Sequence, residues 1–287
     1  MQRSSFLLSA AAAAALPAAA VAVPAAPGRL TELEQHTGGR LGVYALDTGS
    51  GARIAHRAGE RFPMCSTFKT LLVAAVLGRV DHGKEHLQRG IAYGESDLLH
   101  YAPVTRKNVR RGRLSVGELC SATLEWSDNT AANLLLASIG GPSAVTAFAR
   151  LIGDTQTRLD RTEPALNTAL PGDPRDTTTP RAMTENWRAL LLGTALSPHS
   201  RSVLLAGLLA CKTGTARLRA GIPVAWREGD KTGTGDNGTS NDLAILLPPK
   251  RAPILVAAYL TGSTLDGDAR DAALAQVGRF VVASFSA

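Results

Sequence analysis

The chain has 287 residues, of which 45% are hydrophobic and 19% are charged, and its formal net charge is +7. This length and composition suit a well-buried globular protein of one large or two modest domains, with room for a catalytic cleft. The basic balance does not predict a nucleic-acid partner. Lys and Arg are scattered, and the densest cluster, at residues 106–111, has no interleaved aromatic residues, so we interpret it as a solvated face.

The first residues have the pattern of a secretory signal peptide. One positive charge at Arg3 precedes an apolar, alanine-rich run from Phe6 to Val23, and an A-x-A-like site lies at residues 20–22. We expect residues 1–22 to be removed, with cleavage anywhere between Ala20 and Ala26, and the mature chain to be secreted or periplasmic. No apolar run of spanning length follows residue 26, so no membrane anchor is expected after cleavage.

Hydrophobic periodicity and turn residues divide the rest of the chain into short helices and strands. They predict a helix at 30–36 and a hairpin of strands at 41–46 and 54–57. Further helices are expected at 66–77, 115–126, 130–139, 142–152, 179–192 and 198–210. Residues 161–176 contain three prolines, which predicts a long ordered loop. The C-terminal part predicts strands at 229–234, 243–247 and 254–261 and a helix at 268–285.

Strands therefore occur at both ends of the mature chain and helices fill the middle. This arrangement predicts an antiparallel sheet that is built from both termini and flanked by helices, with an all-helical domain inserted. The fold class is α/β plus all-α. The expected boundaries are 27–58 plus 211–287 for the α/β domain and 59–210 for the helical domain, with a cleft between the two.

Ser66 and Lys69 form the first candidate for chemistry. On a helix, positions three apart share a face, so the Lys69 amine would lie within reach of the Ser66 hydroxyl. A serine hydroxyl is a weak nucleophile until a neighbouring base takes its proton, and Lys69 could be that base. The alternative is that Ser66 only caps a helix, because a single S-x-x-K match is expected by chance in a chain this long.

Three further motifs supply what a base-activated serine needs: a proton donor for the leaving group, a cation for substrate charge and donors for an oxyanion. Residues 127–129 read Ser-Asp-Asn between two predicted helices. Residues 231–235 read Lys-Thr-Gly-Thr-Gly on a predicted strand, where Gly233 would let a ligand approach the backbone. Glu163 and Asn167 place a carboxylate and a carboxamide on the long loop.

In this order the motifs resemble those of the class A serine β-lactamases, for which S-x-x-K, S-D-N and K-T-G are the signature. The resemblance covers essentially the whole mature chain, with further matches at residues 101–105, 161–167, 175–178 and 217–221. It implies the penicillin-recognising fold of the serine β-lactamases and hydrolysis of the β-lactam ring of penicillins and cephalosporins, which gives antibiotic resistance. The implied partner is a small-molecule β-lactam, and a monomer is expected.

The resemblance assigns the catalytic roles. Ser66 would attack the lactam carbonyl, and the backbone N–H groups of Ser66 and Thr234 would form the oxyanion hole. Ser127 would relay a proton to the departing ring nitrogen. The remaining catalytic residues are two lysines that lower the cost of this step and a glutamate that activates the deacylating water: Lys69, Lys231 and Glu163. Either Lys69 or Glu163 could be the base for acylation, and the sequence leaves both open.

The resemblance also assigns the residues that bind substrate and support the site. The expected substrate-binding residues are Tyr101, Asn129, Asn167, Arg217, Thr232, Gly233 and Thr234, of which Arg217, Thr232 and Thr234, together with Lys231, would receive the substrate carboxylate. Asn133, Arg161 and Asp176 are expected to hold the loop that carries Glu163, with an ion pair between the last two. Asp128 is interpreted as a brace for its own turn. A second Lys-Thr-Gly triplet, at residues 212–214, is assigned no catalytic role.

No cofactor or metal is expected, since the six histidines form no ligand pattern. The three cysteines, Cys65, Cys120 and Cys211, are an odd and sparse set, and free buried thiols are predicted. Related enzymes bridge the positions of Cys65 and Cys120 to other cysteines. In this sequence the positions of the two partner cysteines are occupied by Gly235 and Val73, so the resemblance predicts an enzyme without disulfides.

Two alternatives stay open. A penicillin-sensitive D-alanyl-D-alanine peptidase would share the serine and lysine motifs but would lack Glu163. A β-lactam sensor would remain acylated, and such receptors normally carry membrane helices. The substrate spectrum among penicillins, oxyimino-cephalosporins and carbapenems is not fixed by the sequence.

Overall fold

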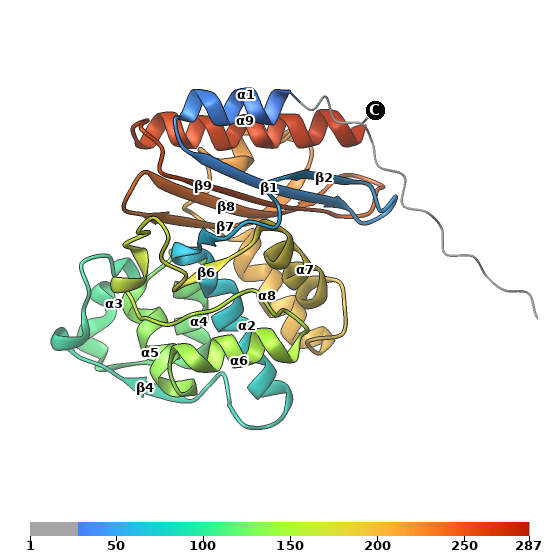
Figure 1. Ribbon diagram of the computed structural model, residues 1–287. Helices are drawn as coiled ribbons and strands as arrows, with labels where there is room; N and C mark the ends of the chain where they lie inside the picture. Colours follow the sequence, from blue (N-terminus) through green and yellow to red (C-terminus); the bar gives the residue numbers. More distant parts are fainter. Residues whose placement is uncertain (1–27, 287) are drawn as a thin grey trace, which may run out of the picture.

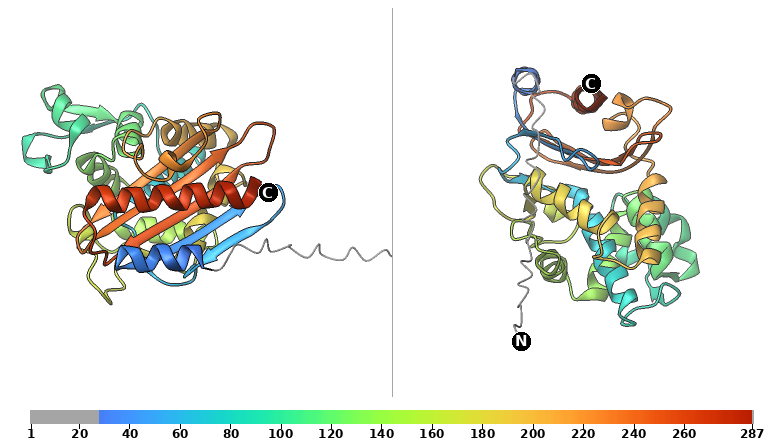
Figure 2. Two further views of the ribbon diagram at one scale, coloured as in Figure 1. Left: turned by 90° about the horizontal axis from the view of Figure 1, so that it is seen from above. Right: turned by 90° about the vertical axis from the view of Figure 1, so that its right-hand side faces the viewer.

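The structure is a computed structural model, which describes residues 28–286. The predicted signal peptide therefore lies outside the described residues. A single antiparallel sheet separates two layers of helices (Figure 1). Two helices that are distant in sequence, α1 (Arg29–Thr37) and α9 (Gly267–Ser286), lie side by side across one face of the sheet (Figure 2). The remaining helices lie below the other face.

The sheet combines strands from both ends of the chain. Its order is β2-β1-β9-β8-β7, formed by β1 (Arg40–Asp47), β2 (Arg53–His56), β7 (Arg227–Gly235), β8 (Thr239–Leu247) and β9 (Ile254–Thr261). Seven of the eight residues of β1 and seven of the eight of β9 are buried, because helices cover both faces and each face must be apolar. The predicted sheet built from both termini is confirmed.

The helical layer surrounds α2 (Phe68–Asp81), whose residues from Phe68 to Leu77 are all buried. A helix that is apolar on every side must be enclosed by others. The helices that pack against α2 are α4 (Val116–Glu125), α5 (Asn129–Ile139), α6 (Pro142–Leu151) and α8 (Pro198–Leu209). The layer also contains α3 (Pro103–Asn108) and α7 (Pro180–Leu191). Two small two-stranded sheets, β3 (Phe62–Pro63) with β6 (Thr177–Thr178) and β4 (Gly90–Ala92) with β5 (Arg113–Ser115), complete this part.

Local sequence signals explain how several helices begin. Ser115 and Glu118 form the predicted capping box at the start of α4. The Asp128 side chain accepts a hydrogen bond from the Ala131 N–H at the start of α5, and Thr179 does the same for Ala182 before Pro180 opens α7. None of the helices within residues 28–286 is by itself long and apolar enough to cross a membrane, although α5 and α6, bent by 72°, pass that test as a pair.

Two local expectations were wrong. Ser66 does not lie in the first turn of α2 but in a short 3-10 turn, Cys65–Thr67, just before it. The strand expected at 243–247 begins four residues earlier, at Thr239. The added residues are polar but buried, since Asn241 donates to the carbonyls of Pro63 and Met64 and Asp242 accepts from the Leu218 N–H. A hydrophobic pattern cannot detect a strand whose polar side chains have internal partners.

Candidate active site

Ser66 is brought to the sheet by close packing of two backbones. The 3-10 turn that contains it follows β3 and faces β7. A Cβ atom on Gly233 would lie 2.7 Å from the Met64 carbonyl oxygen, so only glycine allows β7 to approach this turn. Close packing of β7 on this turn therefore requires a glycine at position 233. The predicted contact of Gly233 with substrate stays a prediction.

Lys69 lies at the centre of the predicted catalytic residues. Its Nζ donates to Ser66 Oγ at 2.9 Å, to the Ser127 carbonyl at 2.8 Å and to Asn129 Oδ1 at 2.6 Å, and it lies 2.9 Å from Glu163 Oε1. The side chains of Lys69 and Glu163 are fully buried. Burial lowers the pKa of Lys69, and the neighbouring Glu163 carboxylate opposes that effect.

Ser127 is placed between the two lysines. Its backbone has a φ of 57°, which is an uncommon conformation for a residue other than glycine. Ser127 Oγ accepts hydrogen bonds from Lys69 at 3.2 Å and from Lys231 of β7 at 3.0 Å. Burial lowers the pKa of Lys231 to about 8, and the positive charge of Lys69 adds to the effect. The hydroxyl thus has two amines with lowered pKa values as neighbours.

Glu163 reaches Ser66 from residues 160–176, which we call the Glu163 segment. Its Oε1 accepts from Ser66 Oγ at 3.2 Å, and its Oε2 accepts from the Asn167 side chain. The Asn133 side chain accepts from the Glu163 N–H at 3.0 Å and donates to the Glu163 carbonyl at 2.9 Å. These contacts fix both ends of the Glu163 residue. The carboxylate is therefore held within reach of the Ser66 hydroxyl.

The predicted ion pair beneath this segment is present, with Arg161 Nε 2.6 Å from Asp176 Oδ2. The other Asp176 oxygen accepts from the N–H groups of Asp160 at 2.7 Å and Arg161 at 2.9 Å. Asp160 Oδ2 accepts from the Asp176 N–H in return, so these hydrogen bonds connect the first and last residues of the segment. A paired and fully hydrogen-bonded carboxylate of this kind gives rigid support.

The opposite end of the site is built around Arg217, which lies in residues 211–221, the Arg217 segment. Its guanidinium donates to Thr234 Oγ1 at 2.7 Å and to the carbonyls of Gly233 and Asn241, both at 2.8 Å. Asp271 of α9 pairs with its Nε at 2.8 Å. Arg217 therefore stands beside Thr234, as expected for a group that receives a carboxylate. Asp271 was not found by sequence reasoning, because nothing in the pattern of an amphipathic helix marks it.

The second Lys-Thr-Gly triplet lies against the first. Thr213 Oγ1 and Thr232 Oγ1 are 2.6 Å apart, so the hydroxyl of Thr232 has a partner within the chain. Lys212 is exposed and donates no side-chain hydrogen bond among the contacts of residues 28–286. The triplet thus supports the neighbouring strand through Thr213, and this contact was missed from the sequence.

Asp128 is the brace that was predicted, and it reaches further than its own turn. Besides capping α5, its carboxylate accepts from the N–H groups of Val104 and Thr105, both at 2.9 Å. The Asn129 N–H donates to the Tyr101 carbonyl at 3.1 Å. Tyr101, 45% exposed, is thereby tied to the Ser-Asp-Asn turn. Its predicted role as a wall of the cleft stays a prediction.

All three cysteines are buried and free. Burial raises their pKa values, to about 12 for Cys120 and about 11 for Cys211, so these thiols stay protonated and unreactive. Cys65 follows the same direction. Within residues 28–286 no group of three or more potential ligands could hold a metal ion.

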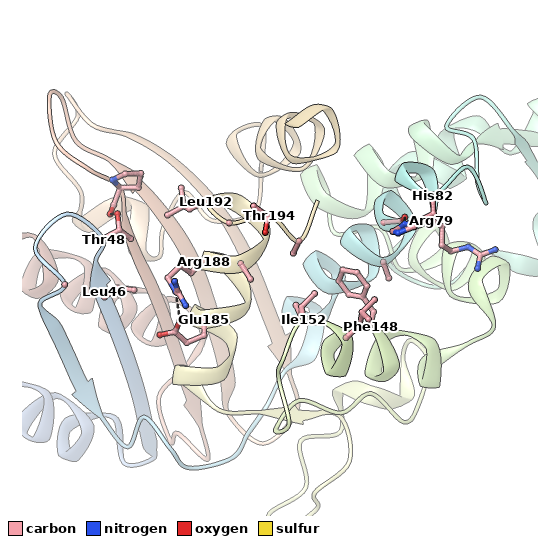
Figure 3. A pocket seen from close by; sticks show the side chains of 18 of the residues that line it. Leu46, Thr48, Arg79, His82, Phe148, Ile152, Glu185, Arg188, Leu192 and Thr194 are labelled. Atoms are coloured by element: carbon pink, nitrogen blue, oxygen red, sulfur yellow. Dashed lines mark hydrogen bonds and ion pairs between the residues drawn. The ribbon is translucent and has the colours of Figure 1, made fainter. Parts of the chain in front are cut away.

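A hollow of about 600 Å³ lies between the Glu163 segment and the end of β7, where Asn167, Thr234 and Gly235 line it. A larger pocket, of about 1180 Å³, lies elsewhere, between α7, α6 and the β1–β2 hairpin (Figure 3). Leu192 and Phe148 line it, and its Glu185 and Arg188 neutralise each other at 2.6 Å. No predicted site residue lines this larger pocket, whereas Asn167 and Thr234 line the smaller hollow and Asn167 donates to Glu163, so we place the candidate site at the smaller hollow.

Comparisons with known proteins agree with this geometry. The profile of the Beta-lactamase enzyme family matches residues 27–285. The chain is 48% identical to β-lactamase CTX-M-8 of Citrobacter amalonaticus, over 88% of this chain and 87% of that one. It is also 48% identical to β-lactamase AST-1 of Nocardia asteroides, over 88% and 82% respectively. The ancestral (GNCA) class A β-lactamase superposes with a TM-score of 0.88 at 63% identity, covering 90% of this chain and 98% of that one. The chain belongs to the β-lactamase enzyme family and is one of its class A serine enzymes.

Proposed function

We propose that Ser66 opens the ring of a β-lactam to form an acyl-enzyme, and that Glu163 activates the water that then releases the product. Membership of class A makes the chain a β-lactam hydrolase that gives antibiotic resistance. The assignment of residues to steps is ours. The observation that carries it is the convergence of Lys69 and Glu163 on Ser66 Oγ, at 2.9 and 3.2 Å.

In the acylation step, the Ser66 hydroxyl loses its proton as Oγ bonds to the lactam carbonyl carbon. Both Lys69 and Glu163 lie within proton-transfer distance, so either can be the base. The backbone N–H groups of Ser66 and Thr234 would stabilise the oxyanion. As the carbon–nitrogen bond breaks, Ser127 passes its proton to the ring nitrogen and takes one from a neighbouring lysine, Lys69 or Lys231.

In the deacylation step, a water held by Glu163 and Asn167 attacks the ester carbonyl. Glu163 takes the proton of the water, and the Ser66 oxygen leaves and recovers a proton. A peptidase or a sensor of this architecture would lack this step. The position of Glu163, fixed by Asn133 and by the Arg161–Asp176 ion pair, therefore supports hydrolysis over both alternatives.

Substrate recognition would use the positive groups at the far end of the site. Arg217 donates to the Thr234 hydroxyl, and Lys231 donates to the Ser127 hydroxyl and the Thr232 carbonyl, so two cations are available for the carboxylate of penicillins and cephalosporins. Asn129 would bind the acylamino group, and Tyr101 would pack against it. We further propose that the chain acts as an exported monomer without a membrane anchor and needs no cofactor.

The test uses purified mature protein, a chromogenic cephalosporin and mass spectrometry of the intact chain. Glu163→Ala is expected to accumulate a stable adduct with a loss of turnover of about 100-fold or more, whereas Ser66→Ala gives neither adduct nor turnover. Glu95→Ala, a change of an exposed glutamate, is the matched control. Accumulation of the adduct in the wild type, with negligible turnover, would show a peptidase or sensor instead.

A further inference from the structure

A buried cluster of carboxyl groups lies on the face of β7 that points away from the catalytic lysines. Side chains alternate along a strand, so Glu228 and Asp230 share one face while Lys231 points to the other. Asp242 of β8 is paired with Thr232 in the register and joins the same face. Glu228 is 8% exposed, and Asp230 and Asp242 are fully buried. No part of the proposed mechanism uses this cluster.

Within residues 28–286 Arg219 is the only guanidinium in contact with the cluster, and it reaches two of the three carboxyl groups. Arg219 Nη2 donates to Asp230 Oδ1 at 3.1 Å, and Arg219 Nε lies 3.2 Å from Glu228 Oε2 without hydrogen-bond geometry. Both oxygens of Glu228, one of Asp230 and one of Asp242 have no hydrogen-bond partner. Burying such groups as anions is costly, and a proton on one carboxyl would turn an unpartnered acceptor into a donor for its neighbour.

The cluster is the platform on which the Arg217 segment rests. The Leu218 N–H donates to Asp242 Oδ2 at 3.1 Å, directly after Arg217. Gly214 packs so closely on Asp230 that a Cβ atom would lie 1.5 Å from Asp230 Oδ2. Contacts to the cluster therefore lie on both sides of Arg217 in the sequence. A shift of the carboxyl groups must move the segment that presents this guanidinium to Thr234.

We propose that Glu228 is a positioning residue for Arg217, and that it acts as an uncharged carboxylic acid whose loss of a proton displaces the Arg217 segment and weakens binding of the substrate carboxylate. This inference rests on the proposed role of Arg217. Burial raises the pKa of Glu228 to about 8, the Asp230 charge adds to this, and Arg219 opposes it. The other charged or titratable groups around the cluster are Cys211, Arg217, Lys231, Asp242 and, paired with Arg217, Asp271.

The first experiment compares the wild type with Glu228→Gln, which keeps the shape and cannot ionise. KM and kcat for a carboxylate-bearing cephalosporin are measured from neutral to alkaline pH. Lys231 also titrates near this range, so the readout is the difference between the two proteins. From neutral to alkaline pH, KM of the wild type should rise about tenfold more than KM of the variant, which corresponds to about 1.4 kcal/mol of binding free energy. The change of kcat with pH should be the same in both proteins. An equal rise in KM in both proteins overturns the proposal.

The second experiment does not depend on catalysis. Infrared spectroscopy should find the C=O stretching band of a buried carboxylic acid that is present at neutral pH, fades at alkaline pH and is absent from Glu228→Gln. Glu95→Gln, at an exposed position, should keep the band. If Glu228→Gln does not fold, Glu228→Met serves the same comparison, since an apolar side chain of similar volume can replace a buried carboxyl. A band unaffected by either substitution shows that Glu228 is ionised and contradicts the inference, even if the protein proves to hydrolyse no β-lactam.

Discussion

The Glu163 segment and the Arg217 segment each deliver one functional residue to the site, but they are anchored in different ways. Three aspartates of the Glu163 segment each pair with an arginine in the segment or just before it: Asp160 with Arg158, Asp173 with Arg175 and Asp176 with Arg161. Both oxygens of every one of these carboxylates accept hydrogen bonds. Beneath the Arg217 segment Arg219 contacts Glu228 and Asp230 but not Asp242, and four oxygens of these three carboxyl groups have no hydrogen-bond partner among the described residues.

Because their anchors differ, the two segments should respond differently to a change of pH or to a substitution in the anchor. A charge-balanced anchor is stable as long as its carboxylates stay ionised, so it is sensitive to loss of an ion. An anchor with excess carboxyl groups is stable only while it keeps a proton, so it is sensitive to rising pH and to crowding. Deacylation should therefore depend on the first anchor and substrate binding on the second.

The largest effect is expected from Asp176→Ala in the Glu163 segment. The substitution removes the 2.6 Å carboxylate partner of Arg161, whose side chain is 19% exposed, leaves it only the Asp173 carboxylate at 3.8 Å, and frees two backbone N–H groups. Breaking a buried pair in this way costs about 3–5 kcal/mol. The free energy of unfolding in urea should fall by that amount, and the acyl-enzyme should accumulate because Glu163 is no longer held.

Asp173→Ala cannot be the control for that measurement, because Asp173 is mostly buried and also lies 3.8 Å from Arg161. Glu185→Ala is the control instead. The side chains of Glu185 and its partner Arg188 are 37% and 57% exposed, so water can replace the lost contact and stability should change little. Equal losses in the two variants, or a stable Asp176→Ala protein that deacylates normally, would show that the ion pair does not support Glu163.

The next effect concerns crowding beneath the Arg217 segment. Gly214→Ala would place a Cβ atom 1.5 Å from Asp230 Oδ2, so Asp230 must move together with its partner Arg219. Overpacking of this kind costs about 1–3 kcal/mol. We expect KM for carboxylate-bearing substrates to rise more than kcat falls, because Arg217 is displaced while Ser66 and Glu163 are not.

Gly59→Ala is the matched control, since no atom lies within 4 Å of a Cβ atom placed there. It should leave stability and KM unchanged. A Gly214→Ala protein with normal KM would mean that the segment can shift without moving Arg217.

The Glu163 segment was easier to predict from the sequence than the anchor of the Arg217 segment. The Glu163 segment follows from local signals: its prolines indicate a loop, and its motif contains Arg161, Glu163 and Asn167 together. The capping box at Ser115 and the strands at both ends of the chain were predictable for the same reason, since each depends on neighbours in sequence or on simple periodicity.

The anchor of the Arg217 segment depends on residues that are distant in sequence. Asp242 lies on another strand from Glu228, and Asp271 lies on the last helix. The buried Asp242 and the half-buried Asp271 look like surface residues when only hydrophobicity is considered. Buried polar residues are also the reason why the start of β8 was placed too late. The contact between Thr213 and Thr232 was missed because a repeated Lys-Thr-Gly triplet has no meaning until the two copies are seen side by side.

The smallest effect is the pH dependence of stability that Glu228 should impose. Its pKa is raised from 4.5 to about 8 in the folded protein, so between these values the folded state binds more protons than the unfolded state. Stability therefore falls as pH rises, and it stops falling once the pH exceeds the folded-state pKa. Between pH 7 and pH 9 this single group should remove about 1.4 kcal/mol. Thermal unfolding of Glu228→Gln should lack that loss. A variant that loses stability with pH as steeply as the wild type would assign the alkaline sensitivity to another group.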